Sequence, residues 1–136
     1  MSNDDRVISI VCIEDEPEMI ELVKIILNRK GYSVHGADGG ETGLSLIRAV
    51  KPDLVLLDLM MPDMDGWEVY QQMKADPEIR DIPVIIVTAK AQNIDKILGL
   101  HIAKVNDYIT KPFGPSELLQ SIQTVLGRSE ETQQLT

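Results

Sequence analysis

The chain has 136 residues, of which 43% are apolar and 26% are charged, a composition typical of one globular domain. No apolar stretch approaches the ~20 residues that a membrane helix needs. The formal net charge of −9 argues against sequence-independent nucleic-acid binding, so we expect a protein or a cation as partner and neither nucleic acid nor a membrane.

The chain opens with a polar segment, residues 1–6, that lacks the basic and apolar regions of a signal peptide. We interpret this segment as a leader and expect a cytoplasmic protein. The single cysteine, Cys12, excludes an internal disulfide, and its apolar neighbours predict a position in the core.

Apolar runs that indicate strands alternate with segments of helical periodicity. The expected strands are residues 7–13, 32–36, 53–58, 83–88 and 107–110. The expected helices are residues 17–28, the segment between Gly40 and Pro52, and residues 67–74, 92–100 and 115–127.

Two glycines affect the expected stability and length of these helices. Gly43 costs about 1 kcal/mol relative to alanine, so the second helix is predicted to be the weaker one. Gly127 is expected to end the last helix, and the polar residues 128–136 are expected to form a frayed tail or a linker.

This alternation predicts an α/β fold. Continuous apolar strands indicate a parallel sheet that is covered by helices on both faces. Right-handed crossovers leave few topologies, and the flavodoxin-like order 2-1-3-4-5 is common at this size. We therefore expect one domain, residues 7–127, with a doubly wound five-stranded parallel sheet and five helices.

Polar side chains stand where four of the expected strands end. These residues are Glu14, Asp15, Asp58, Thr88 and Lys111. Because the carboxyl ends of parallel strands lie at one edge of the sheet, we expect these side chains to meet in one cleft. Crowded carboxylates need a compensating charge, and a hard divalent cation with oxygen ligands, Mg²⁺, would supply it.

The motifs that carry these residues resemble those of the receiver domain of response regulators, the phosphoacceptor module of two-component signalling. They are the acidic pair Glu14-Asp15 and the segments LLDLMMPDMDG (56–66), IVTA (86–89) and YITKPF (108–113). The resemblance spans residues 7–127 and suggests a chemotaxis-regulator-like single receiver. It implies a signalling domain rather than an enzyme, phosphorylated on Asp58 by a sensor histidine kinase or a phosphotransfer protein.

The resemblance also implies roles for the surrounding residues. Asp15, Asp58 and the backbone carbonyl of Met60 would hold Mg²⁺, with Glu14 acting through a bound water. Thr88 would donate a hydrogen bond to the phosphoryl group, and Lys111 would pair with it.

The expected output is a change at the surface formed by the fourth helix, the fifth strand and the fifth helix. Tyr108 corresponds to the aromatic residue of the family that changes its burial on activation. Inward movement of Thr88 would leave room for Tyr108 to follow.

Four places in the chain bear on how far it follows the family pattern. Lys104 stands where many receivers have glycine, so it is expected to be strained if that turn needs a positive φ. Met60 and Lys90 stand where the family tunes the access of hydrolytic water, and the bulky Met60 suggests slow self-dephosphorylation. Residues 120–123 lack the basic side chains of one family dimer interface, so we do not expect that dimer.

Two other functions remain open. A Mg²⁺-dependent phosphatase with an aspartyl nucleophile would share the chemistry of Asp58, but such enzymes generally carry a second aspartate where this chain has Met60. A pseudo-receiver would bind partners without phosphorylation, but the full set of acidic pair, Asp58, Thr88 and Lys111 argues against it.

Overall fold

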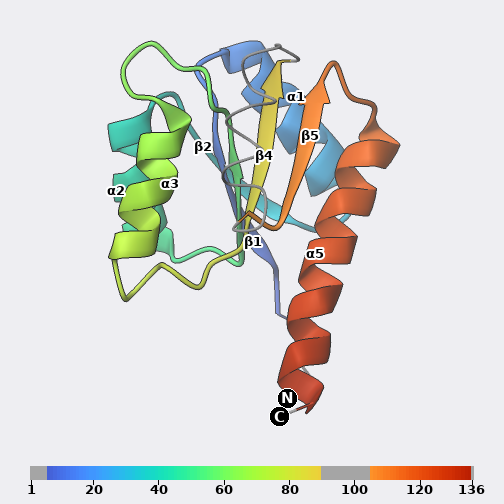
Figure 1. Cartoon of the computed structure of the whole chain (residues 1–136). Helices are drawn as coiled ribbons and strands as arrows, with labels where there is room; N and C mark the ends of the chain where they lie inside the picture. The colour runs from blue at the N-terminus through green and yellow to red at the C-terminus, as the bar shows by residue number, and fades with distance from the viewer. Residues whose placement is uncertain (1–5, 90–104, 136) are drawn as a thin grey trace.

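The computed structural model describes the backbone of residues 6–89 and 105–135 and the side chains of these residues as far as Gly127. It contains a five-stranded sheet in the order β2-β1-β3-β4-β5, and every neighbouring pair is parallel (Figure 1). The predicted flavodoxin-like strand order is therefore confirmed. The strands are β1 (Ser9–Ile13), β2 (Ser33–Ala37), β3 (Leu54–Leu57), β4 (Val84–Ala89) and β5 (Asp107–Lys111).

Helices cover both faces of this sheet. The described helices are α1 (Pro17–Asn28), α2 (Gly40–Val50), α3 (Gly66–Ala75) and α5 (Pro115–Leu135). In Figure 1, α2 and α3 lie on one face and α1 and α5 on the other. The helix expected at 92–100 lies outside the described residues. None of the described helices combines the length and the apolar character that crossing a bilayer requires.

Each face of the sheet has its own hydrophobic core. Successive residues of a strand point to opposite faces, so one continuous apolar run supplies both cores. Leu57 is buried in the core beneath α2 and α3, whereas Leu56 is buried in the core beneath α1 and α5. The apolar runs of the sequence are continuous because each strand contributes side chains to both cores.

Gly43 has a packing role that its helix propensity does not show. A Cβ atom at this position would lie 2.5 Å from Cδ1 of Ile13, closer than real carbon atoms approach. The glycine lets the backbone of α2 pack closely against β1. Its cost in helix propensity is therefore offset by a contact that fixes α2 relative to the sheet.

The expected end of the last helix is wrong. Helix α5 continues through Gly127 as far as Leu135 and extends beyond the sheet (Figure 1). A glycine costs only about 1 kcal/mol in a helix that is already nucleated. The residues that follow it include no proline and several good helix formers, namely Arg128, Glu130, Glu131, Gln133 and Gln134.

Candidate functional site

The polar residues expected in one cleft do lie at one edge of the sheet. Asp58 directly follows β3, and Glu14 directly follows β1, whose last residue pairs with the last residue of β3. Lys111 ends β5 and pairs with Ala89, one residue beyond Thr88 in β4. Parallel pairing thus brings segments that are far apart in the sequence to a common edge.

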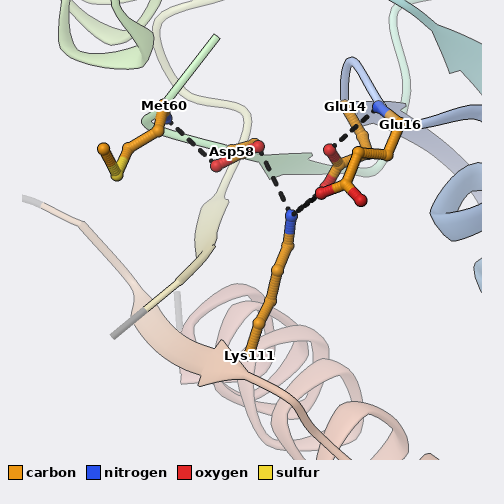
Figure 2. Close-up of polar contacts among 5 residues, drawn as sticks. All are labelled: Glu14, Glu16, Asp58, Met60 and Lys111. Atoms are coloured by element: carbon orange, nitrogen blue, oxygen red, sulfur yellow. Dashed lines mark hydrogen bonds and ion pairs between the residues drawn. The ribbon is translucent and has the colours of Figure 1, made fainter. Parts of the chain in front are cut away.

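Lys111 is the centre of this cluster (Figure 2). Its Nζ donates a short hydrogen bond to Oε1 of Glu14 and lies 3.4 Å from Oδ2 of Asp58. It also lies 3.7 Å from Oε1 of Glu16. One ammonium group is therefore shared by three carboxylates from two different segments.

Burial makes this cluster electrostatically strained. Glu14 and Asp58 are only 2% and 4% exposed. Burial, together with the negative charge of Asp58, raises the pKa of Glu14 to about 7, although the hydrogen bond from Lys111 opposes this. Burial alone would lower the pKa of Lys111, but its hydrogen bond to Glu14 and the charge of Asp58 raise it overall. The site therefore has more negative than positive charge to accommodate.

The acidic pair is in fact a triplet. Glu14, Asp15 and Glu16 place carboxylate oxygens within 4.8 Å of one another, an arrangement that could hold a metal ion. Glu16 was not among the site residues expected from the sequence. Its position as N-cap of α1, with no side-chain capping bond, leaves its carboxylate available to Lys111. The sequence signal that could have identified Glu16 is its place directly after the acidic pair and directly before Pro17, the first residue of α1.

The carboxylate of Asp58 is also held by the backbone that follows it. Its Oδ1 accepts a hydrogen bond of 3.1 Å from the Met60 N–H (Figure 2). The Met60 side chain itself is 57% exposed. Carboxylate and carbonyl oxygens are the ligands that a hard divalent cation prefers, so the donor set at this edge fits Mg²⁺.

Thr88 is at the same edge but is not yet part of the cluster. It is fully buried, and its Oγ1 has no hydrogen-bond partner among the described residues. Leaving a buried hydroxyl unsatisfied costs about 1–3 kcal/mol, so this atom is poised to accept a new partner. Tyr108, two residues before Thr110 in β5, is 41% exposed.

The turn before β5 holds a residue that sequence reasoning did not assign. Asn106 accepts a 2.9 Å hydrogen bond at Oδ1 from the Val84 N–H, and its own N–H donates to the Val84 carbonyl. It thereby fixes the start of β5 beside β4. Lys104 and Lys90, for which the sequence predicted strain and control of water access, lie outside the described residues.

Comparison with known proteins supports a single interpretation. The family model of the response regulator receiver domain matches residues 10–123. The chain is 40% identical over 125 residues to the DNA-binding dual master transcriptional regulator RpaA of Synechocystis sp., covering 92% of this chain and 52% of RpaA. It is 39% identical over 121 residues to the alkaline phosphatase synthesis transcriptional regulatory protein PhoP of Bacillus subtilis, covering 89% of this chain and 49% of PhoP. The chain thus spans about half the length of the curated relatives it matches.

Solved structures show the same relationship. The N-terminal domain of a response regulator receiver protein from Methanoculleus marisnigri JR1 is 38% identical, with a TM-score of 0.72, over 89% of this chain and 98% of that domain. The signal receiver domain of a putative Luxo repressor protein from Vibrio parahaemolyticus is 25% identical, with a TM-score of 0.84, over 96% of this chain and 98% of that one.

Proposed function

Because this chain belongs to the response regulator receiver domain family of two-component signalling, we propose that residues 7–127 act as a phosphoacceptor whose phosphorylated residue is Asp58. The main support for this proposal is the pair of contacts that the Asp58 carboxylate makes. One oxygen accepts from the Met60 N–H, and the other faces the Lys111 ammonium at 3.4 Å. An ionised, oriented carboxylate beside a fixed positive charge is suited to receive a phosphoryl group.

The proposed reaction is a transfer from a phosphohistidine of a sensor histidine kinase or a phosphotransfer protein. An Asp58 carboxylate oxygen attacks the phosphorus, the P–N bond breaks, and the imidazole leaves with its electron pair and takes up a proton. The product is an acyl phosphate. Lys111 compensates the charge on the phosphoryl oxygens, and the backbone N–H of Met60 keeps the carboxylate oriented.

We assign the Mg²⁺ ligands to Asp15, Asp58 and the backbone carbonyl of Met60, with Glu14 acting through a water molecule. The indirect role of Glu14 is supported by its contacts, since one oxygen accepts from Lys111 and the other from the Glu16 N–H at 3.1 Å. When bound, Mg²⁺ would neutralise charge on the transferring oxygens.

The output would begin at Thr88. A phosphoryl group adds strong hydrogen-bond acceptors, and the unpartnered Oγ1 of Thr88 can donate to one of them. Movement of Thr88 would vacate space for the half-exposed ring of Tyr108. Burial of this ring would shift the equilibrium between two arrangements of the surface that includes β5 and α5.

Some of the curated relatives are named as DNA-binding regulators. RpaA is named as a DNA-binding regulator, but the matched region is about half of its length. We expect no direct nucleic-acid contact by these 136 residues, whose net charge is −9. A DNA-binding activity, if this chain is part of such a regulator, would reside in the other half.

Incubation with Mg²⁺ and acetyl phosphate, followed by mass spectrometry of the intact protein, separates three functions. A receiver accumulates one phosphoryl group, and Asp58→Asn accumulates none, while the control Asp38→Asn behaves as the parent. A phosphatase would instead hydrolyse the donor continuously, and a pseudo-receiver would remain unmodified. Either of the latter outcomes contradicts the proposal.

A further inference from the structure

The loop between β3 and α3, residues 58–65, carries Asp58 and Met60 and closes tightly where it meets the start of α3. The Gly66 N–H donates to the Leu59 carbonyl at 3.0 Å. A Cβ atom on Gly66 would lie 2.4 Å from the Asp58 carbonyl oxygen. The base of the loop is thereby fixed, but these contacts do not determine where its tip lies.

The tip is held by Asp63. Its carboxylate accepts the Gly40 N–H, with Oδ2 at 3.0 Å and Oδ1 at 3.3 Å. Gly40 is the first residue of α2, and the N-cap residue, Gly39, has no side chain with which to cap the helix. Asp63 therefore supplies from a distant loop the carboxylate that an N-cap residue normally supplies locally.

The two glycines make room for this contact. A Cβ atom on Gly39 would lie 2.7 Å from Oδ2 of Asp63, and a Cβ atom on Gly40 would lie 2.7 Å from Cβ of Met64. Any larger residue at either position would push the loop tip away. The close fit of two successive glycines against two successive loop residues supports a specific contact, independently of the hydrogen bond.

Helix α2 is in turn fixed to the strand that carries the acidic triplet. Gly43 lies against Ile13, the residue directly before Glu14. The Glu14 N–H donates to the carbonyl of Ala37 at 3.0 Å, at the end of β2 just before α2. Through α2, the contact of Asp63 therefore connects the loop that carries Met60 to the segment that carries Glu14 and Asp15.

We propose that Asp63 is a positioning residue, which caps α2 and so holds loop 58–65 at the spacing from Glu14 and Asp15 that one divalent cation requires. The inference rests on the proposed function, because it assigns a residue that positions the ligands of the same proposed Mg²⁺ site. Among the described residues Asp63 forms no hydrogen bond or ion pair with Asp58 or Lys111, and it acts through the Gly40 backbone. Groups that orient metal ligands in this way typically change metal affinity by 10- to 100-fold.

The test is isothermal titration of Mg²⁺ into the full chain and three variants. Asp63→Ala is expected to raise the dissociation constant by roughly tenfold. Asp63→Asn keeps an acceptor oxygen facing Gly40 and is expected to stay close to the parent. Asp38→Ala removes an exposed carboxylate near the same end of α2, whose own partner is the Thr42 hydroxyl, and is expected to change nothing.

Hydrogen exchange of the Gly40 amide provides the second readout. Exchange should be faster in Asp63→Ala than in the parent, and Asp63→Asn should restore protection together with Mg²⁺ affinity. The inference is wrong if Asp63→Ala binds Mg²⁺ as the parent does, or if Asp63→Asn is as weak as Asp63→Ala, since charge alone would then explain the loss. A parent that neither binds Mg²⁺ nor accepts a phosphoryl group would instead contradict the proposed function.

Discussion

Lys111 Nζ lies 3.4 Å from Oδ2 of Asp58 while it donates a shorter hydrogen bond to Glu14. These two carboxylates are almost fully buried, and they depend on this ammonium for compensation. Lys111 therefore stabilises the fold before any phosphoryl group arrives, and the same charge is then available to the phosphoryl oxygens.

Replacing Lys111 by methionine should expose this dependence. Lys111→Met leaves two buried carboxylates without a counter-charge and should lower the free energy of unfolding by roughly 3 kcal/mol. Saturating Mg²⁺ should restore part of the loss, because the ion binds only the folded site. Urea unfolding with and without Mg²⁺ measures both effects. Lys24→Met, which removes an exposed ion pair with Glu21, is the control and should have little effect.

Met60 should control the lifetime of the phosphoryl group. Met60 is 57% exposed and its N–H donates to the Asp58 carboxylate, so replacing its side chain does not disturb the core. A large apolar group hinders the approach of water, and Met60→Asn should lose the phosphoryl group severalfold faster. The decay is followed by mass spectrometry after removal of the donor. Slower decay than in the parent would refute this role.

Gly66 should tolerate no side chain. A Cβ atom there would lie 2.4 Å from the backbone oxygen of Asp58 and 2.6 Å from Cα of Leu59, and backbone atoms cannot rotate away. Gly66→Ala is expected to lower the free energy of unfolding by about 2 kcal/mol and to slow phosphorylation. At Gly114 nothing lies within 4 Å of a Cβ atom, so Gly114→Ala is the matched control. Equal stabilities of the two variants would contradict the close contact.

Cys12 should make stability fall at high pH. Burial, with the nearby charge of Glu14, raises the pKa of the thiol to about 12 from an ordinary value of 9.0. The folded protein thus keeps the thiol neutral while the unfolded chain ionises. The stability that this difference contributes is complete below pH 9.0 and is lost as the pH rises toward 12. Urea midpoints across this range should fall more steeply for the parent than for Cys12→Ala.

Sequence patterns predicted the sheet and the edge at which the site lies. Continuous apolar runs reveal strands that are buried on both faces, and polar residues at the ends of four of the five expected strands mark the carboxyl edge. Asp58, Glu14 and Lys111 could therefore be placed together from local information and topology.

The remaining features depend on contacts between distant segments. Gly39 and Gly40 resemble an ordinary turn until Asp63 and Met64 are seen against them. Gly43 resembles a weak point until it is seen to pack on Ile13. The same holds for Gly127, whose local preference for ending a helix was overridden by the helix formers that follow it. The helix or turn propensity of a glycine alone therefore does not predict the structural role of these positions.

The most direct test of the account is to locate the phosphoryl group. The protein is phosphorylated with acetyl phosphate and Mg²⁺, reduced with borohydride, which converts an aspartyl phosphate to homoserine, and mapped by peptide mass spectrometry. We expect homoserine at position 58 and at no other aspartate, and none when Mg²⁺ is removed by a chelator. Modification at a different residue, or at Asp58 without Mg²⁺, would contradict the proposed site.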